Sequence, residues 1–188
     1  MKRDLRQKLR EILAAIPEEE IRERSIRACY LLCDQPEFKK AEIMMTFLSL
    51  AHEIDTSPLV LRAWMERTRV LAPKVSWEQR RMLPIEVTSL TQDIRDTPMG
   101  IREPAGGTPI PVANIDLVIV PALGFDALGN RLGRGRGFYD RFLSHRDFRG
   151  VACGLAFEEQ FVDSVPVGSH DMQVDMLVTD KAVRRFGR

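Results

Sequence analysis

The 188-residue sequence is poor in cysteine, and it lacks any long hydrophobic run. Its three cysteines, Cys29, Cys33 and Cys153, cannot all pair, and a chain of this length needs no disulfides to hold a core. We therefore expect buried, reduced thiols and a cytoplasmic protein. No stretch approaches the roughly 18 apolar residues that a membrane-spanning helix requires. The basic N-terminus is interrupted by Asp4 and Glu11, unlike a secretory signal, so no membrane partner is expected.

Neither sign of charge dominates the sequence. The chain has 28 Lys and Arg against 27 Asp and Glu, so its net charge of +1 gives no general attraction to nucleic acid. Its three histidines, His52, His145 and His170, lack the spacing of a metal site, and no Ser, His, Asp arrangement is present. Hydrophobic residues make up 44% of the chain, which suits a single domain over residues 1–188. We expect this domain to be a monomer.

Helical and strand-like segments alternate along the chain. Apolar residues recur at helical spacing from Leu5 to Ile16, and Pro17 with three glutamates begins a helix expected to end near Cys33. A further helix is expected at residues 59–69. The apolar segments that read as strands are residues 43–50, 70–72, 82–87, 115–120, 150–156 and 176–179. This alternation predicts a three-layer α/β fold with a mostly parallel central sheet flanked by helices.

Residues 88–114 form a long connection that is rich in proline and glycine. Gly100, Gly106 and Gly107, together with Pro104, Pro109 and Pro111, interrupt helical and strand patterns alike. We expect no regular element there, although the segment is too long for a plain connection.

The segment after the strand expected at residues 115–120 carries the main functional signal. Gly133, Gly135 and Gly137 alternate, so the backbone can approach a ligand closely and turn several N–H groups toward it. Ligands of parallel α/β sheets bind outside the carboxyl ends of the strands, where this loop lies. The cationic side chains of the loop, which match phosphate or carboxylate oxygens, are Arg131, Arg134 and Arg136. The pattern favours phosphate binding; a plain surface loop is the alternative, because the sequence is neither a Walker A motif nor a dinucleotide fingerprint.

Asp140 lies just inside the helix expected from Phe138 onward. Its carboxylate could hold Mg²⁺ against phosphates. The alternatives are an acid in the first turn of the helix and a partner for a neighbouring arginine.

Residues 120–143 resemble the signature of the 5-formyltetrahydrofolate cyclo-ligase family, also called methenyltetrahydrofolate synthetase. Further segments resemble the family's motifs in the same order: KRDLR at 2–6, EIDT at 53–56, GIREP at 100–104 and HDMQVD at 170–175. The resemblance implies a NagB/RpiA/CoA-transferase-like fold. It also implies ATP-dependent conversion of 5-formyltetrahydrofolate to 5,10-methenyltetrahydrofolate with release of ADP and phosphate, through phosphorylation of the formyl oxygen and attack by N10.

The resemblance implies roles for individual residues. Those matching ATP-binding positions are Lys2, Arg6, Arg131, Leu132, Gly133, Arg134, Gly135, Arg136, Gly137, Phe138 and Tyr139. Those matching positions that bind the folate are Leu48, Glu53, Arg134, Gly135, Arg136, Gly137 and Phe138. Asp140 and Asp171 match Mg²⁺-binding positions, and Arg134 and Tyr139 are expected to be catalytic. Folate and ATP are thus the expected small-molecule partners, with Mg²⁺ as cofactor.

The chain departs from the family pattern inside the loop. Phe138 stands where tyrosine is common, and Arg134 and Arg136 stand where tyrosine and glycine are frequent, which makes the loop more cationic. These changes keep open a non-catalytic folate- or nucleotide-binding protein on the same fold. A basic patch for RNA is a third hypothesis, with arginines at 131, 134, 136, 141, 146 and 149.

Overall fold

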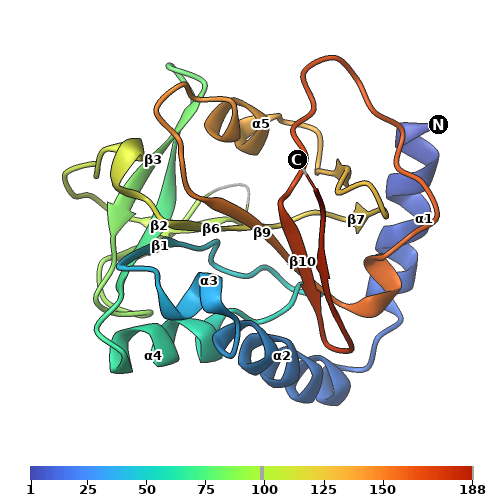
Figure 1. Ribbon diagram of the computed structural model, residues 1–188, viewed down its shortest axis with the longest axis horizontal. Coiled ribbons are helices and arrows are strands. Elements are labelled where there is room, and N and C mark those ends of the chain that lie inside the picture. Colours follow the sequence, from blue (N-terminus) through green and yellow to red (C-terminus); the bar gives the residue numbers. More distant parts are fainter. Residues whose placement is uncertain (98–99, 188) are drawn as a thin grey trace.

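A seven-stranded sheet runs through the computed structural model, which describes residues 1–97 and 100–187 (Figure 1). In spatial order its strands are β11 (Val183–Arg185), β10 (Met176–Thr179), β9 (Val151–Ala156), β6 (Leu117–Val120), β1 (Ile43–Met45), β2 (Arg69–Ser76) and β3 (Arg81–Glu86). The five strands from β10 to β2 are parallel to one another, while β11 and β3 pair antiparallel at the two edges. The predicted mostly parallel sheet is confirmed.

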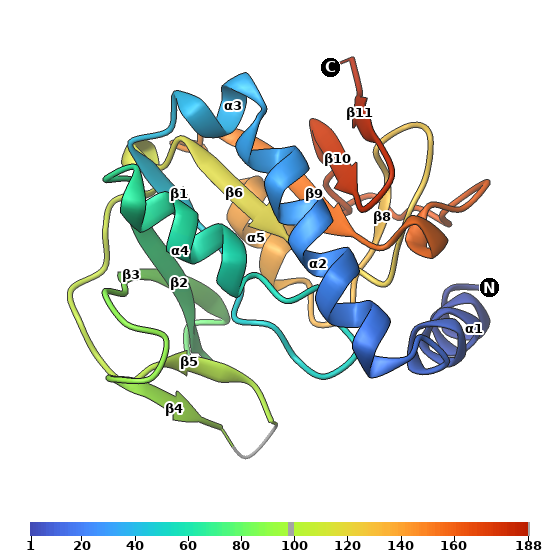
Figure 2. The same ribbon diagram turned by 90° about the horizontal axis from the view of Figure 1, so that it is seen from below.

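Helices cover both faces of this sheet (Figures 1 and 2). The helices α2 (Glu18–Cys33), α3 (Pro36–Lys39) and α4 (Ser57–Met65) lie on one face, and α5 (Phe138–Leu143) lies on the other. The first helix, α1 (Lys2–Ala14), lies beyond the β10 side of the sheet and contacts the 3₁₀ turn η2 (Glu158–Gln160). The three-layer α/β arrangement is therefore confirmed. No helix among the described residues combines the length and apolar character of a membrane span.

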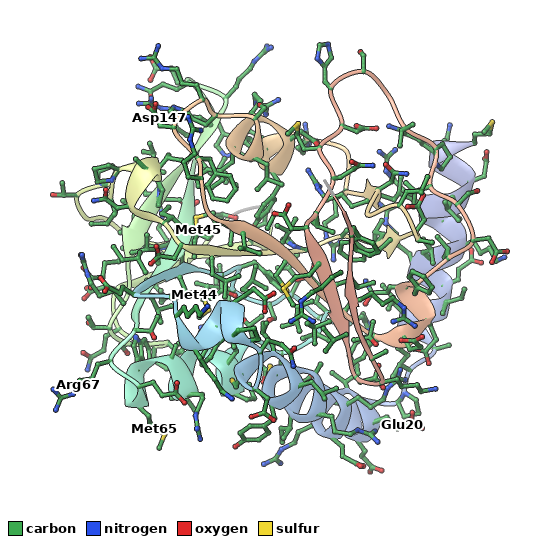
Figure 3. The ribbon with its side chains drawn as sticks, viewed as in Figure 1. Glu20, Met44, Met45, Met65, Arg67 and Asp147 are labelled. Carbon is green, nitrogen blue, oxygen red and sulfur yellow. The ribbon has the colours of Figure 1, made fainter. Side chains whose placement is uncertain are left out.

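The two apolar layers follow from the alternation of side chains along the strands. Leu117 and Ile119 of β6 pack in the cluster that includes α2 and α4, whereas Val118 and Val120 pack in the cluster that includes α5. Met44 and Met45 of β1 divide in the same way, and Figure 3 labels both. All residues of β6 and β1 are buried, as their continuous apolar sequence requires.

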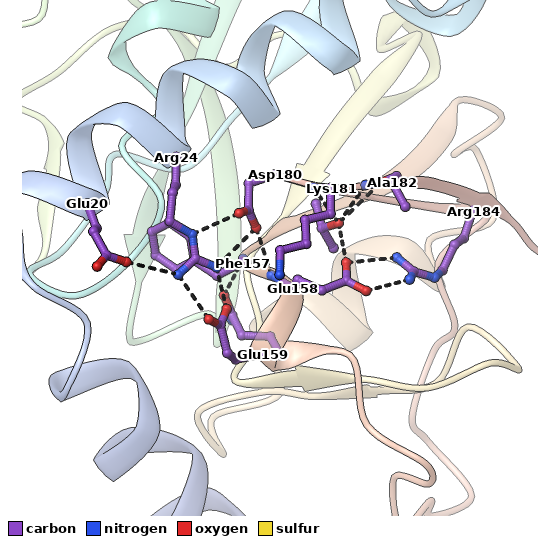
Figure 4. Close-up of polar contacts among 11 residues, drawn as sticks. Glu20, Arg24, Phe157, Glu158, Glu159, Asp180, Lys181, Ala182 and Arg184 are labelled. Carbon is purple, nitrogen blue, oxygen red and sulfur yellow. Dashed lines mark hydrogen bonds and ion pairs between the residues drawn. The ribbon is translucent and has the colours of Figure 1, made fainter.

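A cluster of ion pairs fastens α2 to the carboxyl ends of β9 and β10 (Figure 4). Arg24, whose side chain is only 8% exposed, donates from Nε to Asp180 at 2.8 Å and from Nη1 to Glu159 at 2.9 Å. Its guanidinium carbon also lies 4.9 Å from the centre of the Phe157 ring. The hydrogen bonds that Arg24 donates to Glu159 raise the pKa of Arg24 in spite of its burial. A buried charge needs such complete pairing, because an unpaired one costs several kcal/mol.

Several predicted element boundaries were wrong. The strand expected at residues 43–50 ends at Met45, after which the chain leaves the sheet. The helix expected to reach residue 69 ends at Met65, because Arg67 adopts a left-handed backbone with φ 63° and Arg69 already begins β2. β2 extends to Ser76 rather than residue 72, since it pairs with β3 along its second half.

The expectation of no regular element at residues 88–114 was also wrong. This segment forms an antiparallel pair, β4 (Ile94–Asp96) with β5 (Arg102–Pro104), followed by the 3₁₀ turn η1 (Val112–Asn114). Gly100, with φ 72°, lies in the connection between the strands, and Pro104 ends β5. The breaking residues therefore mark the ends of elements. Residues 98 and 99 lie outside the described ranges.

The three cysteines are buried and free, as predicted. Burial raises the pKa of Cys29 and of Cys33 to about 12, so both remain protonated thiols at neutral pH.

The packing around β9 yields a stability prediction. A Cβ atom at Gly154 would lie 2.6 Å from Phe125 Cε1 and 2.8 Å from Phe125 Cζ, and Phe125 is fully buried. Gly154→Ala should therefore lower the free energy of unfolding by about 1–3 kcal/mol through overpacking, measured by urea denaturation. Gly106→Ala is the matched control, because a Cβ there meets nothing within 4 Å. Equal denaturation midpoints for the two variants would contradict the prediction.

Candidate functional site

A cavity of about 400 Å³ opens at the carboxyl ends of β1 and β6. The chain passes from β1 through α4 to β2 on one side, while β6 lies on the other side of β1. This is the switch point at which ligands of open α/β sheets bind. The volume suits a small organic molecule.

Every residue that the sequence predicted for the site lines this one cavity. They are Lys2, Arg6, Leu48, Glu53, Asp171 and the continuous segment 131–140. The segment follows β6, whereas Leu48 and Glu53 follow β1, and α1 supplies the two N-terminal cations. The fold thus brings together residues from distant parts of the sequence.

The glycine segment begins in a small hairpin that sequence patterns did not reveal. Its strands are β7 (Gly124–Phe125) and β8 (Arg131–Leu132), and the Asp126 carboxylate accepts hydrogen bonds from the backbone of Leu128 and Asn130, each at 3.0 Å. Two of the following glycines adopt left-handed backbones, Gly135 with φ 108° and Gly137 with φ 66°. Gly137 is also the N-cap of α5. The conformation at both positions requires glycine.

A buried ion pair holds the two ends of this segment together. Arg131, whose side chain is 3% exposed, donates from Nη2 to Asp140 Oδ1 at 2.6 Å. The same oxygen accepts the backbone N–H of Met172 at 2.9 Å. Burial lowers the pKa of Arg131, although the nearby Asp140 carboxylate opposes this, and an arginine stays charged at any physiological pH. Asp140 therefore fits both structural alternatives, because it lies in the first turn of α5 and is the partner of Arg131.

The N-terminal helix is attached to the same segment. Arg6 donates from Nε to the carbonyl oxygen of Gly133 at 2.9 Å, and Lys2 forms an ion pair with Asp171. Asp171 Oδ2 also accepts the backbone N–H of Gly168 at 2.7 Å. Partial burial opposes ionisation of Asp171, but the hydrogen bonds from Lys2 and from the Gly168 N–H, together with the charges of Lys2 and Arg131, outweigh it and keep the pKa below its usual value. Asp171 is therefore an anion at neutral pH.

Arg134 and Glu53 contact each other across the cavity. Nε and Nη2 of Arg134 donate to Glu53 Oε1 at 3.0 and 2.6 Å, and Leu50 donates its backbone N–H to Oε2 at 2.9 Å. The Glu53 side chain is 13% exposed and that of Arg134 is 44% exposed. Both oxygens of the carboxylate are thus engaged in the ligand-free protein.

Two polar atoms of the site have no partner. Arg131 Nε and the Tyr139 hydroxyl oxygen are buried and make no hydrogen bond to residues 1–97 or 100–187. Burial raises the pKa of Tyr139, so its hydroxyl is a neutral donor. Buried polar groups are nearly always hydrogen-bonded in folded proteins, and exceptions call for an explanation such as water or a ligand. Both atoms belong to residues that line the cavity.

The β2–β3 hairpin forms a wall of the cavity that the sequence did not predict. Trp77, in its turn, has its ring centre 5.3 Å from that of Phe138, with the two planes at 86°. The other cavity-lining residues that were not predicted are Phe47, Leu50, Pro73, Val75, Met82, Ile101, Arg102 and Pro121. No local sequence signal marks Pro73, Val75, Trp77 and Met82, because antiparallel pairing of β3 with β2 brings this hairpin to the cavity.

The donor set for a metal ion is limited to two carboxylates. Within the part of the chain that the structure describes, no cluster of three or more His, Cys, Asp or Glu side chains could hold a metal. The contacts described above use Oδ1 of Asp140 and Oδ2 of Asp171, so each carboxylate retains a second oxygen. Mg²⁺ usually binds through one or two carboxylates together with substrate phosphates and water. The residues present fit an ion held in that way.

The fold and the cavity define a three-layer α/β protein with an arginine- and glycine-lined site at the switch point of its sheet. Residues 1–180 match the profile of the 5-formyltetrahydrofolate cyclo-ligase family, and the chain belongs to this family.

Individual relatives match the sequence of this chain over most of their length. The 5-formyltetrahydrofolate cyclo-ligase of Mus musculus is 29% identical over 184 residues, which cover 93% of this chain and 91% of the mouse protein. The enzyme of that name from Escherichia coli K12 is 27% identical over 183 residues, which cover 93% of this chain and 98% of the E. coli protein. The NMR structure of Aquifex aeolicus 5,10-methenyltetrahydrofolate synthetase superposes with a TM-score of 0.85 at 32% identity, covering 100% of this chain and 94% of that one.

The unpartnered hydroxyl of Tyr139 yields a prediction for the ligand-free protein. Tyr139→Phe removes a buried hydroxyl that forms no hydrogen bond to the described residues, so the free energy of unfolding should rise by about 0.5–1 kcal/mol. Urea denaturation without ligand measures this change. Tyr30→Phe is the control, because Tyr30 is 53% exposed and its hydroxyl can bond to water. A loss of stability in Tyr139→Phe would show that the hydroxyl already has a partner.

Proposed function

We propose that this chain converts 5-formyltetrahydrofolate to 5,10-methenyltetrahydrofolate with hydrolysis of ATP to ADP and phosphate. The observation that carries the proposal is that one cavity is lined by every residue predicted for ATP, folate and Mg²⁺. Membership of the family over residues 1–180 supports the same activity.

The reaction needs an activated formyl group, because its oxygen is a poor leaving group. Transfer of the γ-phosphoryl group of ATP to this oxygen makes it a phosphate ester and leaves an electrophilic carbon. N10 then attacks that carbon, the new C–N bond forms, the N10 proton is lost, and phosphate departs with the electrons of the C–O bond. Phosphoryl transfer of this kind depends mainly on positioning and on neutralising charge.

The cationic end of the cavity is suited to the phosphates of ATP. Arg131 is fixed by Asp140 and keeps Nε unpaired, so its charge is already in place before the reaction begins. Gly135 and Gly137 adopt left-handed backbones, which leaves N–H groups of the loop available to donate to phosphate oxygens. Lys2 and Arg6 complete this end from α1. Asp140 and Asp171 would hold Mg²⁺, which neutralises phosphate charge when bound.

Glu53 is suited to the pterin ring, whose amino and ring N–H groups are donors. Its Oε1 accepts both hydrogen bonds from Arg134, so a pterin that binds this oxygen must displace that guanidinium. Arg134 is then free to move to the phosphoryl group being transferred, which is consistent with a catalytic role. Folate binding thereby favours ATP binding, and the coupling is reciprocal.

Tyr139 is placed to act on the substrate through its hydroxyl. The group is a neutral donor, because burial raises its pKa, and the described residues provide it with no acceptor. We assign it a hydrogen bond to an oxygen of the bound substrate. Phe138 contributes only its ring at the neighbouring position, where the family commonly has a second tyrosine.

The activity itself is the direct test. Purified protein with 5-formyltetrahydrofolate and Mg-ATP should give the methenyl product, followed by its near-ultraviolet absorbance, and removal of Mg²⁺ by a chelator should abolish turnover. Absence of product with folded protein would overturn the proposal. Saturable folate binding without turnover, measured by calorimetry, would support the non-catalytic alternative instead.

The role of Glu53 gives a prediction that separates the two substrates. Glu53→Gln removes the charge that accepts the pterin donors, so KM for 5-formyltetrahydrofolate should rise about tenfold to a hundredfold. KM for ATP should change much less, and steady-state kinetics measure both. Glu86→Gln is the matched control, since Glu86 pairs with Arg69 on β2 and β3 away from the cavity-lining set. Equal increases in the two KM values would contradict a folate-specific role.

A further inference from the structure

The turn between β2 and β3 presents a partly exposed indole to the cavity. Trp77 lines the cavity and is 48% exposed, although a tryptophan gains much from burial. Phe138 meets it edge to face at 5.3 Å, and the guanidinium carbon of Arg136 lies 5.6 Å from its ring centre. The loop thus covers part of the indole and leaves about half of its surface uncovered at the site.

Arg141 of α5 holds this turn in place. Its Nε donates to the carbonyl oxygen of Arg80 at 2.6 Å, and its Nη2 donates to that of Arg136 at 2.9 Å. Its guanidinium carbon also lies 5.0 Å from the centre of the Phe138 ring. Arg80 has a left-handed backbone, with φ 49°, at the end of the turn. Trp77 is therefore positioned before a ligand arrives, and ordering it costs little entropy on binding.

The two ends of the cavity differ in chemistry. Lys2, Arg6 and Asp171 line it from the side of α1, whereas Pro73, Val75, Trp77 and Met82 line it from the β2–β3 hairpin. Figures 1 and 2 both place α1 and the hairpin at opposite ends of the molecule. Phosphates suit the first end, and a flat apolar ring suits the second.

Two arginines that line the cavity indicate which ring binds at Trp77. Arg136 lies over the indole, and Arg102 lines the same cavity from β5. Adenine and p-aminobenzoyl are both flat rings, but only the second continues into a glutamate with carboxylate groups. The guanidinium group of Arg136 next to the indole, and that of Arg102 in the same cavity, match those carboxylates.

We propose that Trp77 is a specificity-determining residue that stacks on the p-aminobenzoyl ring of the folate, while Arg136 and Arg102 bind its glutamate carboxylates. This inference rests on the proposed function, because it names the part of the site that holds the tail of the same substrate.

Fluorescence tests the contact without turnover. The chain has two tryptophans, and Trp64 lies on α4, where its Nε1 donates to the carbonyl oxygen of Val87 at 3.2 Å. Trp64→Phe leaves Trp77 as the only indole, and its emission should be quenched saturably by 5-formyltetrahydrofolate, after correction for folate absorbance. A non-hydrolysable ATP analogue with Mg²⁺ should leave the emission unchanged. Trp77→Phe, which retains Trp64, should respond to neither ligand.

Kinetics test the consequence for the substrate. Trp77→Leu should raise KM for 5-formyltetrahydrofolate about tenfold, the effect of ~1.4 kcal/mol of lost stacking, with kcat and KM for ATP nearly unchanged. Trp77→Phe should recover part of the loss. Arg136→Gln should raise KM for 5-formyltetrahydrofolate, but not for 5-formyltetrahydropteroate, which lacks the glutamate.

The outcomes separate this inference from the proposed function. Turnover with wild-type KM values in Trp77→Leu, or quenching by the ATP analogue alone, would overturn the stacking assignment while the activity stands. Saturable quenching by the folate in a protein without turnover would overturn the activity and keep the assignment.

Discussion

The buried ion pair between Arg131 and Asp140 is the contact on which the shape of the site depends. It connects β8 to the first turn of α5, so the glycines between them must form a tight loop. Asp140 also accepts the N–H of Met172, which brings the segment before β10 to the same point. Removing either partner would leave an uncompensated charge in a place that water scarcely reaches. The loop is therefore fixed by electrostatics as well as by backbone conformation.

The layers of the fold were predictable because they depend on local patterns. The continuous apolar sequence of β6 and the exact bounds of β10 follow from burial on both faces of a parallel sheet. β1 is shorter than its apolar run, because the apolar residues that follow it, such as Leu48, serve as the wall of the cavity. Sequence hydrophobicity alone does not distinguish a residue buried in a sheet from one that lines a binding site.

Only the part of the site that lies in sequence motifs was predictable. Arg134 was predicted from the glycine and arginine loop and Glu53 from the resemblance, but their mutual ion pair depends on the way the loops after β1 and β6 face each other. Trp77 had no motif, since its place at the cavity follows from the pairing of β3 with β2 over six residues. Contacts of this kind are set by tertiary structure and are absent from any local pattern.

The charges of the cavity are balanced mainly by contacts between its own side chains. Six cationic side chains and three carboxylates line the cavity among the described residues. Each carboxylate is paired with a cation: Glu53 with Arg134, Asp140 with Arg131, and Asp171 with Lys2. Arg134 is 44% exposed and Lys2 is 33% exposed, so water screens the charges of these two pairs more than those of Arg131 with Asp140. Arg131 is thus a cation held at the cavity by a buried pair, whereas the side chain of Arg134 is paired with Glu53 and remains partly exposed.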